Sequence, residues 1–215
     1  MDIYQIFPDP IYFSTLEREL TKGELNTINK FKIRTLINKD EEGYNYTNYS
    51  NVKTRQSVDH QVLEKKGLSN LKKDLNKAIL DYFDRVVCSS NPITPYITLS
   101  WLNYTQSNET LHRHAHPNSF VSGVFYIDAD KKVDKIIFHK GDYERIRLES
   151  KRFNVFNSPS WWFPIEKGKI VLFPSHLIHG VENKQGTNRR LSLAFNVFLK
   201  GRIGNANNLT ELVLG

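Results

Sequence analysis

Thr110-Leu-His-Arg-His-Ala-His-Pro-Asn-Ser-Phe-Val-Ser-Gly-Val-Phe-Tyr-Ile127 is the stretch that decides the fold. Three histidines at alternate positions precede an apolar run with the alternation of a β-strand. The segment 173–181 has the same character, and the two stretches together hold five of the seven histidines. The pattern predicts imidazole groups at strand ends, in the mouth of a barrel.

The second half of the chain predicts short strands. Runs rich in β-branched and aromatic residues, separated by Gly, Asn, Asp or Pro, lie at 93–104, 120–127, 134–139, 153–157, 168–174, 179–183 and 190–199. Two facing sheets of this size suit a jelly roll with an open end that can hold a ligand.

The first half predicts supporting helices. Apolar residues from Leu68 to Val86 recur every three or four positions, which is typical of a helix that covers a sheet. The segments 14–17 and 21–24 resemble capping boxes and predict two short helices broken near Gly23. Helices followed by strands indicate an α+β fold, with a cupin-like jelly-roll (double-stranded β-helix) core and N-terminal helical support.

The length of 215 residues favours one domain, 1–215. We expect a helical support and loop, a jelly-roll core and a C-terminal tail, at 1–90, 91–200 and 201–215. Within these parts, 38–58 predicts an irregular loop and 143–164 a long insertion or lid, because both segments lack periodicity.

Composition limits the classes of function. The net charge is +7, but Lys and Arg are scattered along the chain, which argues against a dedicated nucleic-acid-binding protein. The sequence has no apolar stretch long enough for a membrane span and no evident secretory signal. The single cysteine, Cys88, excludes an intrachain disulfide framework. We therefore expect a soluble, cytoplasmic protein.

The histidine spacing indicates a metal site. In an extended strand alternate side chains share a face, so His112, His114 and His116 would point the same way. A mononuclear iron site commonly uses a His-x-Asp/Glu pair and a distant histidine on one face of an octahedron. The pair of ligands is either His114 with His116 or His112 with His114, and the Pro-x-Ser-x-x-Ser-Gly run that follows favours the former.

Several motifs, in the same order, resemble those of the Fe(II)- and 2-oxoglutarate-dependent dioxygenases, specifically a group found in bacteria and bacteriophages. They are Phe7-Pro-x-Pro10, Trp101-Leu-Asn-Tyr104, His114-x-His-Pro-x-Ser119, Ser122-Gly-Val-Phe-Tyr126, and Phe173-Pro-Ser with His179, Arg190-x-Ser192 and Asn196. The resemblance implies an oxidoreductase that binds Fe(II), uses 2-oxoglutarate as co-substrate, and releases succinate and CO2 while it hydroxylates a second substrate. For a phage-encoded member, the compartment would be the host cytoplasm.

Carried over by position, the resemblance implies that His114, His116 and His179 bind the metal. His116 stands where most of the superfamily has aspartate, which leaves three neutral ligands. Asp128 or Asp130 could instead supply an oxygen ligand, but both lie at the far end of their strand. The dianionic co-substrate would restore charge balance.

Arg190 matches the residue that receives the 2-oxoglutarate tail, in a bidentate pair that suits a guanidinium. Ser192, two residues further on, could add a hydroxyl. Arg189 competes for this role, since alternation puts only one of the two inside. The remaining candidates for hydrogen bonds to the co-substrate are Asn103, Tyr104 and Tyr126.

Two other functions are compatible with the predicted β architecture. One is a cupin-like three-histidine metalloprotein, either an isomerase or an oxygenase that does not use 2-oxoglutarate. The other is a non-enzymatic ligand-binding β-sandwich. The primary substrate, a small molecule or a peptide, is not encoded in any readable motif.

Overall fold

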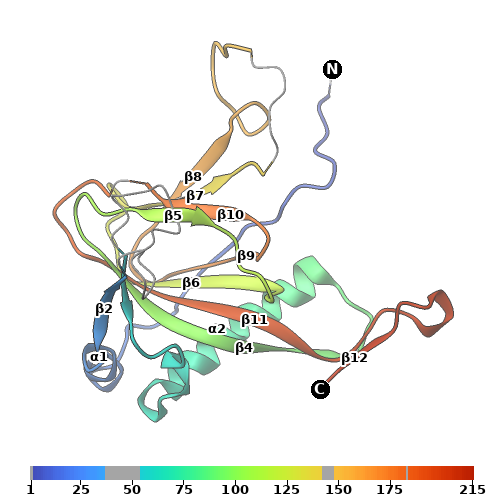
Figure 1. Ribbon diagram of the computed structural model, residues 1–215, viewed down its shortest axis with the longest axis horizontal. Helices are drawn as coiled ribbons and strands as arrows, with labels where there is room; N and C mark the ends of the chain where they lie inside the picture. The colour runs from blue at the N-terminus through green and yellow to red at the C-terminus, as the bar shows by residue number, and fades with distance from the viewer. Residues whose placement is uncertain (1, 37–53, 142–147, 183) are drawn as a thin grey trace, which may run out of the picture.

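Two facing antiparallel sheets form the centre of the protein. The computed structural model describes residues 2–36, 54–141, 148–182 and 184–215 (Figure 1). The large sheet has the order β1-β9-β6-β11-β4-β3-β2, with β12 also paired to β11, and the small sheet has the order β5-β10-β7-β8. The strands are β1 (Tyr12–Thr15), β2 (Ile33–Leu36), β3 (Thr54–Ser57), β4 (Ile93–Thr105), β5 (Leu111–His114), β6 (Val121–Asp128), β7 (Lys135–His139), β8 (Ser160–Pro164), β9 (Lys169–Pro174), β10 (Ile178–Val181), β11 (Arg190–Ile203) and β12 (Leu212–Leu214).

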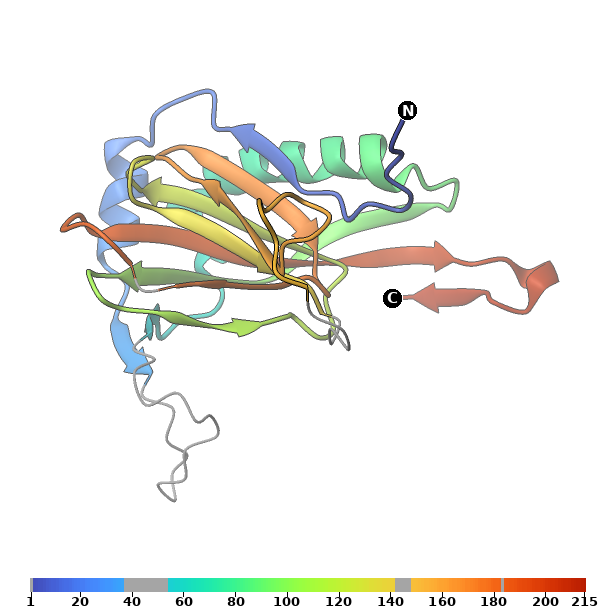
Figure 2. The ribbon, with the colours of Figure 1, turned by 90° about the horizontal axis from the view of Figure 1, so that it is seen from above.

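This arrangement confirms the predicted double-stranded β-helix with helical support. The helix α2 (Ser69–Tyr82) lies along the outer side of the large sheet (Figure 2). Its apolar stripe, with Leu71, Leu75 and Ile79, joins the core cluster that also contains Leu193 and Phe195 of β11. The periodicity of this segment was therefore a correct signal, because a helix on a sheet must bury one face.

The longest strands, β4 and β11, pair from Thr105 opposite Arg190 to Ile93 opposite Gly201. Side chains along each strand alternate between the helix-covered core and the space between the sheets. Gly123 of β6 shows how tightly the core side is packed. A Cβ atom there would lie 2.2 Å from the ring of Phe195, so only glycine fits.

Only one of the two predicted capping boxes begins a helix. In α1 (Lys22–Asn29) the Thr21 hydroxyl accepts from the Glu24 amide, and the Glu24 carboxylate accepts from the Thr21 amide. Gly23 lies inside this helix rather than between two helices. Ser14, in the other predicted box, belongs to β1, because pairing with β9 satisfies its backbone.

Replacement of Glu24 by glutamine is expected to lower the free energy of unfolding at pH 7 by about 2 kcal/mol. The Arg18 guanidinium, followed by hydrogen bonds from Thr21, lowers the pKa of the Glu24 carboxyl from 4.5 to about 2. Since the folded-state pKa is depressed, this stability is present above pH 4.5 and is lost as the pH falls toward 2. Urea unfolding at pH 7 and pH 3 checks this, with exposed Glu19→Gln as the control.

Several other predictions about elements were wrong. The segment 153–157 forms turns, with Phe153 and Phe156 exposed and no partner strand among the described residues. The strand lies further on, at β8, which pairs with β7 and forms an edge of the small sheet (Figure 1). The remainder of the predicted lid includes 143–147, which lie outside the described residues.

Two other segments that we expected to be irregular contain paired strands. Of the predicted loop 38–58, residues 38–53 lie outside the described part, while 54–57 form β3, which pairs with β4 and β2. The predicted C-terminal tail is a projecting hairpin, in which β11 continues to Ile203 and turns into β12 (Figure 2). The division into a single domain with three parts stays a prediction.

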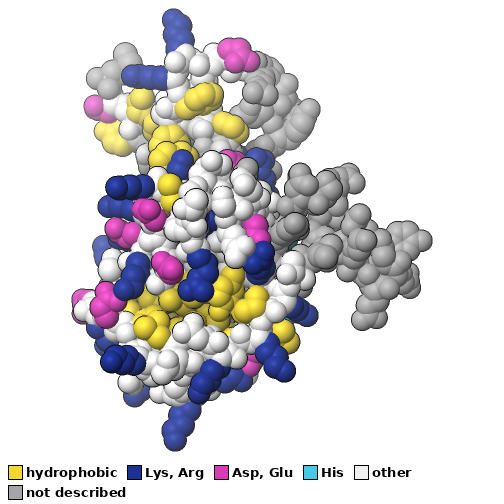
Figure 3. Space-filling model, turned by 90° about the vertical axis from the view of Figure 1, so that its left-hand side faces the viewer, with side chains coloured by type: hydrophobic (Ala, Val, Ile, Leu, Met, Phe, Trp, Pro, Cys, Tyr) yellow, Lys and Arg dark blue, Asp and Glu magenta, His cyan; other side chains and the backbone are white. Residues whose placement is uncertain are grey.

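The surface is consistent with the scattered basic residues of the sequence. On the face shown in Figure 3, Lys and Arg side chains are mixed with Asp and Glu around a hollow that exposes hydrophobic side chains. Among the described residues, no helix is long and apolar enough to cross a membrane.

Candidate metal centre and co-substrate cavity

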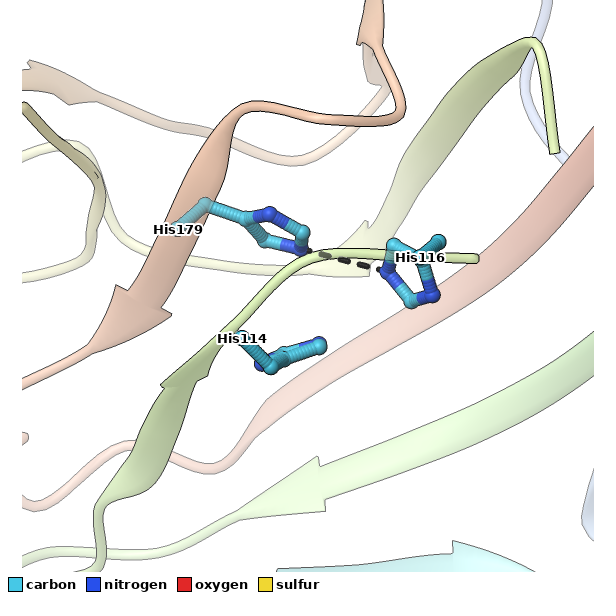
Figure 4. Close-up of side chains that lie close together, drawn as sticks. All are labelled: His114, His116 and His179. Carbon is cyan, nitrogen blue, oxygen red and sulfur yellow. Dashed lines mark hydrogen bonds between the residues drawn. The ribbon is translucent and has the colours of Figure 1, made fainter. Parts of the chain in front are cut away.

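Three histidines from two parts of the chain meet between the sheets. His114, at the end of β5, pairs with His179 of β10. His116 lies just beyond β5, where its amide donates to the Ser175 carbonyl at 2.9 Å. One candidate ligand atom from each ring lies within 4.8 Å of the others, and the His116 and His179 Nε2 atoms are 3.3 Å apart (Figure 4). Nitrogen ligands about 2.1 Å from one ion, at right angles, are about 3 Å apart, so the separation of the His116 and His179 Nε2 atoms fits two ligands of a single metal.

Backbone carbonyls orient two of the rings. His114 Nδ1 lies 2.8 Å from the His112 carbonyl, and His179 Nδ1 lies 2.9 Å from the Leu177 carbonyl. A carbonyl can only accept, so in both rings Nδ1 carries the proton and Nε2 keeps its lone pair. The structure thus presents nitrogen donors in the form that a metal requires.

Burial keeps these imidazoles neutral. It lowers the pKa of His116 to about 4 and that of His179 to about 3, with the neighbouring histidines adding smaller effects in the same direction. The pKa of His114 is also lowered by burial. At neutral pH all three rings are therefore unprotonated and available as ligands.

Of the two possible ligand pairs, one lies in the histidine cluster. His114 and His116, rather than His112 and His114, cluster with His179. His112 lines the same cavity with its ring centroid 5.0 Å from that of His114, and its buried Nδ1 has no hydrogen-bond partner among the described residues. Trp101 also lines this cavity, with its ring centroid 5.7 Å from that of His116.

The remaining histidines lie outside the cluster. His139, buried on β7, is opposite Ile178 of the neighbouring strand β10. His176 is exposed and lies 3.4 Å from Asp9, as expected from its position three residues before His179. The possible oxygen ligands Asp128 and Asp130 are both exposed and do not line the cavity.

A cavity of about 400 Å³ extends from the histidine cluster to Arg190. Arg190 is 5% exposed, and its guanidinium donates to the Lys135 carbonyl at 2.9 Å and to the Tyr126 hydroxyl at 3.4 Å. Its Nε has no partner among the described residues. Arg189 is exposed, with its guanidinium 5.9 Å from the Tyr104 ring centroid. Only Arg190 of the two therefore lines the cavity.

Three of the four other predicted co-substrate contacts reach the cavity. Ser192, Tyr126 and Asn103 line it, and Asn103 Oδ1 is buried without a hydrogen-bond partner among the described residues. Tyr104 does not line it, and it packs against the core cluster beneath the sheet. Asn103 and Tyr104 are neighbours on one strand, so alternation allows only one of them to face the cavity.

The sequence reasoning missed a hydroxyl network that holds the loop carrying His116. Ser175 Oγ lies 2.9 Å from Ser122 Oγ and donates to Ser119 Oγ at 2.8 Å, and Ser122 Oγ donates to Asn196 Oδ1 at 3.3 Å. The Ser175 carbonyl also holds the His116 amide. These residues occur in the quoted motifs, but spacing alone gives them no role.

Fold and site together define a jelly-roll protein with a three-histidine centre and a buried arginine. A family model described as "Putative 2OG-Fe(II) oxygenase" matches residues 99–196. This stretch contains the three histidines and Arg190. Over this stretch the chain resembles the 2OG-Fe(II) oxygenases, and the class of activity that the match supports is that of an oxidoreductase using iron and 2-oxoglutarate.

Solved structures share the fold at low sequence identity. HygX from Streptomyces hygroscopicus, with nickel, 2-oxoglutarate and hygromycin B bound, is 13% identical over 88% of this chain and 82% of its own, with a TM-score of 0.54. A prolyl-4-hydroxylase from Pseudomonas putida is 10% identical over 87% and 92%, with the same TM-score. A 2OG-Fe(II) oxygenase family oxidoreductase from Burkholderia pseudomallei is 12% identical over 80% and 75%, at 0.53. No curated protein sequence matches the chain.

Proposed function

We propose that His114, His116 and His179 hold Fe(II) and that Arg190 binds the distal carboxylate of 2-oxoglutarate, in a hydroxylase that acts on a small molecule. One observation carries the proposal: three neutral imidazoles and a buried guanidinium with an unpartnered Nε face the same cavity. When bound, iron and 2-oxoglutarate supply the oxidation, in which oxygen is consumed, succinate and CO2 leave, and a substrate C–H becomes C–OH.

The residues of the chain fit this cofactor pair. The Nε2 lone pairs suit a divalent metal, and the charge of Arg190 suits the dianionic co-substrate. The hydroxyls of Ser192 and Tyr126, together with Asn103, line the space around the guanidinium and can orient the bound acid. Apolar side chains such as Phe173 line the same cavity and exclude water from the reacting groups.

The proposal of a small-molecule substrate rests on the volume of the cavity and on the similarity of the fold to that of HygX. A cavity of about 400 Å³ is in the range of small-molecule sites. HygX, with a similar fold, holds hygromycin B. Candidate small molecules and peptides can be compared by the succinate that each adds above the substrate-free rate. Stimulation by peptides alone would contradict the small-molecule assignment.

Anaerobic addition of Fe(II) and 2-oxoglutarate tests the metal and co-substrate roles together. We expect a visible charge-transfer band that needs both components and disappears with a chelator. The band reports direct chelation of the metal by the keto acid. A protein that binds iron but gives no band with 2-oxoglutarate would favour the cupin-like rival, and one that retains no metal would favour the ligand-binding β-sandwich.

A further inference from the structure

A buried charge pair borders Arg190 outside the co-substrate cavity. Asp134 and Lys184 are 1% and 3% exposed, and Lys184 Nζ lies 3.5 Å from Asp134 Oδ1. Both residues line a second cavity, of about 460 Å³, that Arg190 also lines. The guanidinium of Arg190 thus separates the co-substrate cavity from a buried carboxylate and its partner.

The hydrogen bonds that hold the Asp134 carboxylate reach Oδ2, while Oδ1 has no hydrogen-bond partner among the described residues and lies 3.5 Å from Lys184 Nζ. The Oδ2 atom accepts from the Asp130 amide and from Asn188 Nδ2, both at 2.8 Å. Lys184 Nζ donates to Asn188 Oδ1 at 2.9 Å, which ties the ammonium and the amide into one cluster. Lys184 is thus the cation that lies beside the Asp134 carboxylate.

Arg190 has no such partner. Asp134 immediately precedes Lys135, whose carbonyl accepts from the guanidinium at 2.9 Å. Nevertheless, no ion pair with a carboxylate is formed by Arg190 among the described residues. A buried cation that is left without an anion keeps a strong affinity for one, because its desolvation is not offset.

We propose that Lys184 is a positioning residue that keeps the Asp134 carboxylate away from Arg190 and so leaves the guanidinium free for 2-oxoglutarate. This inference rests on the proposed role of Arg190. Without the ammonium group, Asp134 would be an unbalanced anion beside a buried guanidinium. It would then compete with the distal carboxylate of the co-substrate for the same charge.

Binding of 2-oxoglutarate to a Lys184→Met variant tests the proposal. With Mn(II) in place of iron, without oxygen and at pH 8, we expect the Kd of 2-oxoglutarate to rise roughly ten- to hundredfold, the effect of one nearby charge. Binding of Mn(II) alone should not change. Lys184→Arg, which keeps the charge, should retain the affinity.

A second substitution separates the charge effect from simple loss of structure. Adding Asp134→Asn to Lys184→Met removes the competing anion and is expected to restore the Kd to within about threefold of wild type, since neutral replacement of a buried pair is often tolerated. Thermal unfolding of each variant identifies any that are unfolded, and Lys184→Gln provides a second neutral variant.

The outcomes are distinct. An unchanged Kd in folded Lys184→Met or Lys184→Gln, or a double variant that binds no better than the single one, would overturn the role of Lys184. Failure of the wild type to bind 2-oxoglutarate with Mn(II) present would contradict the proposed function itself.

Discussion

Replacement of His179 by alanine is expected to reduce succinate formation to the level of the metal-free control. His179 is the ligand candidate contributed by β10, and its Nε2 lies 3.3 Å from that of His116. Removal of one of the three proposed ligands leaves two imidazoles, with no carboxylate among the described residues that line the cavity to replace it. Metal content after dialysis, together with succinate yield, measures both effects.

The matched control for this variant is His176→Ala. His176 lies three residues earlier and is exposed, so its loss should change neither metal content nor turnover. Succinate formation by His179→Ala above the metal-free control would count against the metal centre. Equal loss in both variants would point to damage in the segment between β9 and β10 rather than to loss of a ligand.

Replacement of Arg190 by alanine is expected to raise the KM for 2-oxoglutarate by roughly 30- to 150-fold, equivalent to about 2–3 kcal/mol for charge-assisted hydrogen bonds. The reason lies in the charge of the guanidinium. Among the described residues that line the cavity, Arg190 is the only one with a formal charge when the histidines are neutral. Arg190→Lys should recover part of the affinity, since an ammonium supplies charge without the bidentate geometry. Initial rates at varied 2-oxoglutarate provide the measurement.

Arg189→Ala is the control for the neighbouring position, because Arg189 is exposed and outside the cavity. Its KM for 2-oxoglutarate should stay within about twofold of wild type. If Arg190→Ala kept both metal binding and activity, the anchored co-substrate would be wrong. The cupin-like three-histidine protein would then explain the cavity better.

The sequence alone determined the elements in which apolar residues repeat at the spacing of a helix or a strand. The apolar stripe from Leu68 to Val86 predicted α2 because a helix buries one face, and the runs that became β4, β6, β9 and β11 carried the alternation of strands. The position of the histidines at the ends of such runs located the candidate metal centre. These signals depend on neighbours in the chain, so they can be read before any contact is known.

Only the tertiary structure decided how these parts meet. Spacing left open whether His112 or His116 joins His114, and the answer depends on β10, which brings His179 opposite His114. It also left open which of Arg189 and Arg190 faces inward, because both sides of β11 are buried. The pairing of β3 and β8, the position of Tyr104 and the Asp134–Lys184 pair likewise depend on partners distant in the chain. Such pairing leaves no periodic trace in the sequence, and it is what places three rings and one guanidinium around a single cavity.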